Sequence, residues 1–175
     1  MYNVGDKLVH PMHGAGVVEA VEEKNILDEK KFYYVMRMPV GDVKVMIPVD
    51  STESVGVRNV IDSVEAENVM KAFSDYSADL STNWNKRYRD NMEKMKHGDI
   101  LDIAYVVKTL MLKEKTKGLS MGERKMLNSA RQILISEMVI AKNSTIDEID
   151  ECLNNIVSEE LQSEEDKIVE GVDIA

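Results

Sequence analysis

Short apolar runs separated by glycine and proline residues fill the first sixty positions of the chain. The run at residues 31–38 is rich in aromatic side chains, and the run at 43–47 alternates apolar and polar residues until Pro48. Runs of this length and composition, bounded by turn residues, are typical of β-strands. With no helical pattern between them, they indicate a small antiparallel β-barrel. We predict its strands at residues 7–10, 17–21, 31–38, 43–47 and 55–58.

After residue 60, apolar residues recur every three or four positions, the spacing that places them on one face of a helix. Trp84, Tyr88, Met92 and Met95 form one such stripe, which ends before Gly98. Similar stripes predict a short helix and three longer ones, at residues 64–73, 100–117, 120–142 and 145–158.

Polar residues mark the starts of several of these helices. Asp99 can cap the helix that begins after it. The pairs Ser120 with Glu123 and Thr145 with Glu148 fit the capping box, in which each side chain satisfies a free backbone N–H of the other residue. Beyond residue 158 the chain is acidic with few apolar residues, and we expect it to fray.

These patterns together predict an α+β protein with two modules. Residues 1–60 form the β module, and residues 61–175 form a bundle of about four helices with an acidic tail after about residue 143. A polar stretch at residues 80–83 is predicted to be a linker. We expect a monomer, although such a linker could also let two chains exchange their helices in a domain-swapped dimer.

Charge divides the chain into three blocks. The chain has 22 Lys and Arg against 32 Asp and Glu, a net charge of −10. Residues 81–142 are basic, with thirteen Lys and Arg against seven Asp and Glu, whereas the segments before and after them are acidic. Such a basic block suits a nucleic-acid surface, but variation in sign among helix surfaces explains it equally well.

The composition excludes several classes of protein. A hydrophobic share of 43% with 31% charged residues is typical of a globular chain. No apolar run approaches the roughly 20 residues that a membrane span needs, and the N-terminus does not resemble a signal peptide. The single cysteine, Cys152, allows no intramolecular disulfide. We expect an intracellular, cytoplasmic protein.

No motif makes a convincing case for an enzyme, a cofactor or a metal. Residues 118–122 match the nucleophile elbow, but a charged helix precedes them and the last histidine, His97, comes before Ser120. Residues 14–16 lack the third glycine of a dinucleotide fingerprint, and there is no phosphate-binding loop. His10 and His13 have no third metal ligand nearby. A small enzyme therefore remains a remote alternative.

One segment combines the only tryptophan of the chain, Trp84, with three cations. In one interpretation Trp84 is a core anchor, as most tryptophans are, and the cations Lys86, Arg87 and Arg89 form a solvated helix face. In the other, the indole lies at the surface, where an aromatic wedge can enter a minor groove or stack on a base. The cations would then bind phosphates through counterion release.

A second basic pair, Arg124 and Lys125, stands in the first turn of a later helix, which is a favourable position for a phosphate. Two basic patches on separate helices favour nucleic acid as the partner. A different class of function stays open, namely an adaptor that binds only protein and uses its basic block to contact an acidic partner.

Several short motifs, in order and at fitting spacing, resemble the CarD family of bacterial RNA polymerase-binding transcription regulators. The resemblance runs from about residue 2 to residue 142. The motifs are Val4-Gly5-Asp6, Pro11-Met12-His13-Gly14, Gly41-Asp42, Ile47-Pro48, Val55-Gly56-Val57-Arg58, Thr82-Asn83-Trp84, Arg87-Tyr88, Gly118-Leu119-Ser120 and Ala130-Arg131-Gln132-Ile133-Leu134.

The resemblance implies a Tudor-like N-terminal domain that binds the polymerase β subunit. It also implies a helical domain that contacts promoter DNA at the upstream edge of the melted bubble. Trp84 matches the family tryptophan that wedges into the minor groove there, and Arg87, Arg89 and Arg124 fall on or near basic, DNA-facing positions. Lys24 matches one of the basic polymerase-contacting positions, whereas Met46 occupies the other.

The hypothesis is a transcription regulator without enzymatic activity or cofactor, which docks on polymerase and stabilises the promoter open complex with low sequence specificity. Transcription-repair coupling factors share the N-terminal module, but this chain has no phosphate loop for their helicase motor. An exposed strand edge can dock by main-chain pairing. The candidate edge comprises Val43, Lys44, Val45, Met46 and Ile47.

Overall fold

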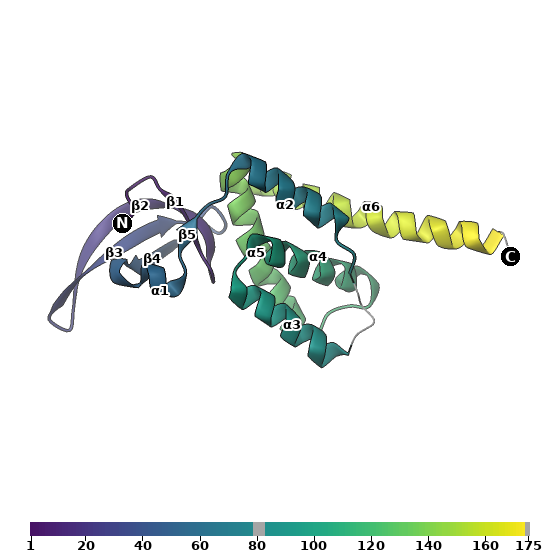
Figure 1. Ribbon diagram of the computed structural model, residues 1–175, viewed down its shortest axis with the longest axis horizontal. Coiled ribbons are helices and arrows are strands. Elements are labelled where there is room, and N and C mark those ends of the chain that lie inside the picture. Colours follow the sequence, from purple (N-terminus) through teal and green to yellow (C-terminus); the bar gives the residue numbers. More distant parts are fainter. Residues whose placement is uncertain (79–82, 174–175) are drawn as a thin grey trace.

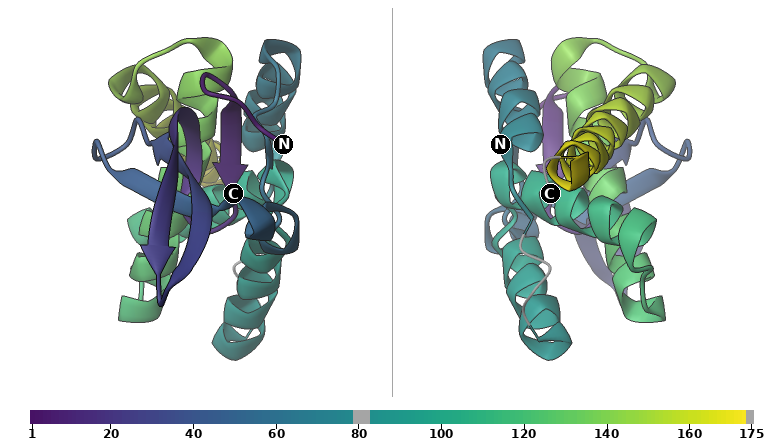
Figure 2. Two further views of the ribbon diagram at one scale, coloured as in Figure 1. Left: turned by 90° about the vertical axis from the view of Figure 1, so that its left-hand side faces the viewer. Right: turned by 90° about the vertical axis from the view of Figure 1, so that its right-hand side faces the viewer.

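The computed structural model describes residues 1–78 and 83–173, which form an antiparallel sheet followed by helices (Figure 1). The sheet lies at one end of an elongated molecule, and the last helix projects from the other end. Seen along the long axis, the sheet stands in front of the helical part in the left view of Figure 2, and α6 points toward the viewer in the right view. This arrangement confirms the predicted α+β class and is consistent with a Tudor-like β module.

Five antiparallel strands pair in the order β4-β3-β2-β1-β5, so that β4 and β5 are the edges of the sheet. The core of this module is formed by Leu8, Val18, Tyr34, Met36, Met38, Ile47 and Val57. The strands are β1 (Lys7–His10), β2 (Gly14–Ile26), β3 (Glu29–Arg37), β4 (Lys44–Pro48) and β5 (Arg58–Asn59).

Strand β2 extends well beyond the predicted run at residues 17–21, whereas β3 nearly matches the run at 31–38, and the two strands form a projecting arm (Figure 1). They are joined by a two-residue turn, Leu27–Asp28, in which both residues have positive φ, as a type I′ hairpin requires. The surface of the arm carries charged side chains and also the exposed apolar residues Ile26, Leu27 and Phe32. Lys30 and Glu23 form an ion pair across the arm at 3.3 Å. Apolar periodicity could not detect this extension because the arm buries little.

The predicted fifth strand at residues 55–58 is largely wrong. A short 3-10 turn, η1 (Val49–Ser51), leads instead into the helix α1 (Thr52–Val55). Gly56 ends α1 with a φ of 86°, and its N–H donates to the carbonyls of Thr52 and Glu53. Because the chain turns at this left-handed glycine, only Arg58 and Asn59 reach the β1 ladder.

The helical module contains five helices in the described part of the chain, one for each of the five helical stripes in the sequence, although the bundle was expected to have about four. The capping boxes at Ser120 with Glu123 and at Thr145 with Glu148 are both confirmed, and Asp99 caps the helix after it. The helices are α2 (Ser63–Asp75), α3 (Trp84–His97), α4 (Ile100–Thr116), α5 (Met121–Lys142) and α6 (Ile146–Asp173).

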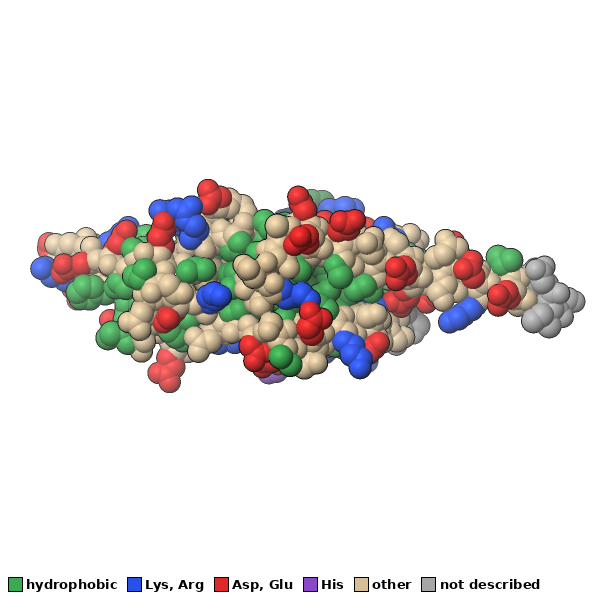
Figure 3. Space-filling model, turned by 90° about the horizontal axis from the view of Figure 1, so that it is seen from above, with side chains coloured by type: hydrophobic (Ala, Val, Ile, Leu, Met, Phe, Trp, Pro, Cys, Tyr) green, Lys and Arg blue, Asp and Glu red, His purple; other side chains and the backbone are tan. Residues whose placement is uncertain are grey.

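The acidic tail does not fray at residue 158 as expected, because α6 continues to Asp173. Leu153 and Val157 pack in the core of the helical module, and Leu161 is partly buried against it. Beyond Leu161, α6 stands free of the bundle with acidic side chains on its surface (Figure 3). Helix-favouring residues and the absence of proline allow the helix to continue there.

Lys108 of α4 is fully buried and links three helices. Its ammonium group donates to the carbonyl oxygens of Phe73 at 2.8 Å and Ser74 at 2.9 Å, at the end of α2. The same group lies 2.6 Å from a carboxylate oxygen of Glu160 on α6. A buried lysine is thus matched by one carboxylate and two carbonyls, which satisfies its three donors.

The predicted linker at residues 80–83 lies outside the described residues except for Asn83, whose side chain caps α3. None of the helices that the structure describes combines the length and apolar character that a bilayer crossing requires.

Candidate nucleic-acid interface

Trp84 lies at the surface, at the first position of α3. Its side chain is 44% exposed, so the interpretation of Trp84 as a core anchor is wrong. One face of the indole stacks on Tyr88, with ring centroids 5.3 Å apart and an angle of 20° between the planes. Tyr88, Met92 and Met95 follow on the same face and pack against the core, as the stripe predicts. The stack therefore presents a fixed aromatic surface to solvent.

Three cations follow Trp84, but they do not all face outward. Lys86 and Arg89 are exposed, and the Nε of Arg89 donates to the carbonyl of Asn85 at 3.4 Å. The side chain of Arg87 is only 13% exposed, and its guanidinium lies 3.9 Å from the carboxylate of Glu123 on α5. Arg87 is therefore placed to hold α3 against α5.

Glu123 is the centre of a buried polar network. Its carboxylate accepts from the ammonium of Lys113 at 2.7 Å and from the backbone N–H of Ser120 at 3.0 Å. Burial opposes ionisation, but the hydrogen bonds from Lys113 and Ser120 outweigh it and hold the pKa of Glu123 below its ordinary value. With Arg87, this network joins α3, α4 and α5 and so positions the basic starts of α3 and α5.

The second basic pair lies on α5, beside the aromatic stack. Arg124 and Lys125 are both exposed, and Arg124 lies 3.3 Å from Glu114 of α4. Gly122 faces the ring of Tyr88, where a Cβ atom would approach a ring carbon to 3.3 Å. The absence of a side chain at Gly122 thus lets α3 and α5 pack closely and brings Lys125 and Tyr88 to one groove.

The residues predicted to contact polymerase are divided between the two faces of the sheet. Lys24, Lys44 and Met46 lie on one face of the sheet. Their cross-strand partners on β3 are Lys31, Arg37 and Val35, and these residues share a face because side chains alternate along a strand. Val45 and Ile47 point the other way, and Ile47 is a core residue that is 2% exposed. Val43 precedes β4 and is exposed. The edge position expected for residues 43–47 is present in β4.

Glu19 binds Lys44, one of the residues predicted to contact polymerase, and the sequence did not indicate this role. It stands at a bulge between Val18 and Ala20, where the register of β2 shifts. Its carboxylate binds Arg37 at 3.0 Å and Lys44 at 3.2 Å, and these hydrogen bonds lower its pKa. A charged residue inside an apolar strand pattern was the available signal for the bulge.

The two modules meet at a buried junction. The guanidinium of Arg58 on β5 binds both carboxylate oxygens of Glu137 on α5, at 2.7 and 2.8 Å, and Glu137 also accepts from the N–H of Ile61. Next to this pair, the hydroxyl of Ser136 accepts from the N–H of Ala15 at 2.8 Å. No motif in the sequence indicated either contact, although Glu137, an acid within the apolar stripe of residues 126–138, was a signal.

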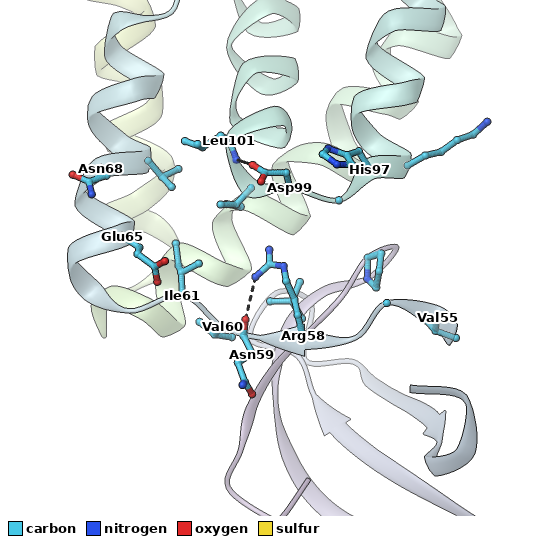
Figure 4. Close-up of a pocket in the computed structure, with 17 residues that line it drawn as sticks. Val55, Arg58, Asn59, Val60, Ile61, Glu65, Asn68, His97, Asp99 and Leu101 are labelled. Carbon is cyan, nitrogen blue, oxygen red and sulfur yellow. Dashed lines mark hydrogen bonds between the residues drawn. The ribbon is translucent and has the colours of Figure 1, made fainter. Parts of the chain in front are cut away.

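A cleft of about 780 Å³ lies beside the junction, between β5, the start of α2 and the turn between α3 and α4 (Figure 4). Several of its polar groups are engaged within the chain. Arg58 points from β5 toward the helices and also donates to the carbonyl of Asn59, and Asp99 accepts from the N–H of Leu101. The cleft therefore fits a structural joint better than a ligand site.

The two N-terminal histidines are in contact, with ring centroids 4.5 Å apart. Burial and the nearby charge of His13 lower the pKa of His10, whose Nδ1 accepts from the N–H of Met12. In the described part of the chain, no group of three His, Cys, Asp or Glu side chains is placed to hold a metal ion.

Comparisons with known proteins match both modules. The family model described as "CarD-like/TRCF RID domain" matches residues 2–61, and the model described as "CarD, C-terminal domain" matches residues 68–154. YdeB of Bacillus subtilis (strain 168), a protein provisionally named as a transcription factor, is 42% identical over 145 residues. The similar region covers 83% of this chain and 95% of YdeB.

Proposed function

The chain belongs to the CarD family of transcription factors, and from this premise we propose that it stabilises the promoter open complex of a bacterial RNA polymerase. The β module docks on the polymerase β subunit, and the helical module places Trp84 at the upstream edge of the bubble. The protein acts on the nucleoid as a monomer and catalyses no reaction. Family membership supports the regulatory role, and the RID match supports an interaction with polymerase.

The observation that carries the proposal is the exposed Trp84–Tyr88 stack, with Lys86 and Arg89 beside it and Arg124 and Lys125 at the start of α5. An aromatic wedge between base pairs costs a few kcal/mol of unstacking in intact duplex, and less where the DNA is already distorted. The wedge therefore binds the melted state better than the closed one, and this difference in affinity shifts the population toward the open complex.

The sheet edge supports polymerase docking. Strand β4 is an edge strand, and an edge strand leaves main-chain groups available to pair with a strand of a partner. Lys24, Lys44 and Met46 share the face next to this edge, and their side chains give the contact specificity. In this arrangement Met46 supplies an apolar contact where the family places a basic residue.

Tethering explains how a chain with a net charge of −10 acts on DNA. Once docked, the helical module meets promoter DNA at a high effective concentration, so that weak intrinsic affinity is sufficient. A wedge and phosphate contacts read the shape and deformability of DNA more than base edges. The protein therefore acts at many promoters with low sequence specificity.

The test is the lifetime of promoter open complexes formed by a bacterial polymerase, measured with the wild-type chain, Trp84→Ala and Val64→Ala. Val64 is an exposed apolar residue on α2 and serves as the matched control. We expect the wild type and Val64→Ala to lengthen the lifetime and Trp84→Ala to lose most of this effect. Equal lifetimes with all three variants, despite polymerase binding, would contradict the wedge.

Binding of the same variants to polymerase and to a forked DNA probe tests the alternative of an adaptor that binds only protein. Such an adaptor would bind polymerase equally well before and after the Trp84→Ala substitution and would show no affinity for a forked DNA probe. Loss of probe binding in Trp84→Ala, together with a decline of wild-type binding as salt increases, would argue against it.

A further inference from the structure

A groove of about 490 Å³ lies between α3 and α5, next to the aromatic stack. This volume is within the range of roughly 300–1,000 Å³ that is common for small-ligand sites. Most of its lining is apolar, and much of it is methionine, whose flexible thioether adapts to the shape of a bound group and packs well against aromatic rings. The main apolar lining residues are Met12, Tyr88, Met92, Met95, Met126 and Ile133.

The groove is continuous with the proposed wedge. Tyr88 lines the groove and also carries the indole of Trp84 on its ring. Gly122 lies against the ring of Tyr88 at the groove, where a Cβ atom would meet a ring carbon at 3.3 Å and narrow the opening. A strand that passes Trp84 therefore reaches the groove directly.

The charge of the groove indicates its occupant. Among the residues that the structure describes, its charged lining residues are Lys96 and Lys125, and no Asp or Glu lines it, although the chain has 32 acidic residues. The cleft at the module junction differs, because Glu65 and Asp99 line it together with cations. Apolar walls with cationic residues suit a ligand that combines a flat apolar ring with an anionic group.

We propose that the groove receives an unpaired base of the DNA strand beside the wedge, with Lys96 and Lys125 near its phosphates. This site rests on the proposed function, because it requires Trp84 to hold the DNA at a fork. The ring packs between the methionines and the edge of Tyr88, and Ser129, which also lines the groove, supplies a hydroxyl for the edge of the base. Capture of one unpaired base adds affinity for melted DNA alone.

The experiment uses two reporters in the intact chain and two forked DNA probes. One probe has a single-stranded arm of thymidines, and the other has an abasic arm with the same phosphates. Fluorescence of the only tryptophan reports the wedge. Methyl NMR signals of labelled methionines report the groove through Met92, Met95 and Met126, with Met36 of the sheet core and the exposed Met121 as internal controls.

We expect both probes to change the Trp84 fluorescence, because both contain a fork. We expect only the thymidine arm to shift the signals of Met92, Met95 and Met126, while Met36 stays unchanged and Met121 responds equally to both probes. Filling the groove with Ser129→Phe should abolish these base-dependent shifts and weaken binding of the thymidine fork to the level of the abasic fork. Asn128→Phe, on the neighbouring exposed position outside the groove, is the matched control and should behave as the wild type.

The outcomes separate the two proposals. If Trp84 fluorescence responds but the groove methionines shift equally with both probes, or not at all, the groove proposal is wrong and the wedge stands. If Trp84 responds to neither fork, the proposed function fails at its first step. If polymerase without DNA shifts the groove methionines, the occupant is a polymerase side chain and the assignment to a base is overturned.

Discussion

Arg58 and Glu137 form a two-point ion pair across the junction of the β module and the helical module, with N–O distances of 2.7 and 2.8 Å. Glu137 is fully buried, and the pair is supported by the backbone N–H of Ile61. Bidentate pairing of arginine with a carboxylate fixes both distance and angle. The Arg58–Glu137 pair therefore helps to set the orientation of the sheet edge β4 relative to Trp84, although it belongs to neither the proposed polymerase surface nor the proposed DNA surface.

Removal of one member of this pair should lower the free energy of unfolding more than removal of both members. Arg58→Met leaves the carboxylate of Glu137 buried without its cation, and we expect a loss of about 3 kcal/mol in the free energy of unfolding. The double variant Arg58→Met with Glu137→Met should recover most of that loss. Urea unfolding of the single and double variants measures this, and additive losses would refute strong coupling between the two residues.

Gly14 should tolerate a side chain far less well than Gly5, although the backbones of the two glycines are similar. Gly14 has a φ of 92°, and a Cβ there would lie 2.4 Å from the hydroxyl oxygen of Ser136 and 3.1 Å from the Cα of Ile133. Gly5 has almost the same φ, 94°, but open space around it. Gly5→Ala should therefore cost only the backbone strain, about 1–3 kcal/mol. Gly14→Ala should cost clearly more, and equal unfolding midpoints for the two variants would contradict the close packing at the junction.

Acid should weaken the helical module through Glu123. The folded-state pKa of Glu123 is below the ordinary 4.5, so its ion pair adds stability above that value and loses it as pH falls through the folded-state pKa. Glu123→Gln should be less stable than the wild type at neutral pH, with a difference that shrinks in acid. Urea unfolding across this pH range provides the measurement, and a constant difference would exclude the titration of Glu123 as the cause.

Arg87 and Arg89 should give different phenotypes although they are two residues apart. Arg89 is exposed, so Arg89→Ala should reduce the slope of the logarithm of DNA affinity against the logarithm of salt concentration by about one unit, with little loss of stability. Arg87 lies mostly buried beside Glu123, and Arg87→Ala should lower the thermal midpoint with a smaller change of slope. A full-unit loss of slope in Arg87→Ala would place its guanidinium on DNA.

Features that depend on residues close together in the chain could be predicted from the sequence. The capping boxes at Ser120 and Thr145 depend on residues three positions apart, and the stripe from Trp84 to Met95 follows from helical spacing alone. Exposure of Trp84 could not be predicted in this way, because it depends on the position of the indole at the start of α3 and on stacking with Tyr88.

Contacts between distant segments were beyond the sequence patterns. Glu137 lies on the buried side of α5, and only the approach of β5 supplies its partner, Arg58. The β2–β3 arm has little buried surface and therefore no clear alternation. The extended α6 is anchored by Glu160 on the buried Lys108, a pairing between residues that no local pattern connects.

Lys108 has a consequence for the way the helical module opens. One ammonium group bonds the last carbonyls of α2 and a carboxylate in the middle of α6, so neither segment can detach without leaving a buried charge partly unmatched. These segments, remote in the chain, therefore belong to one cooperative unit in amide exchange. Detachment of the acidic helix α6 should therefore also loosen the end of α2, because both are bound to the ammonium group of Lys108.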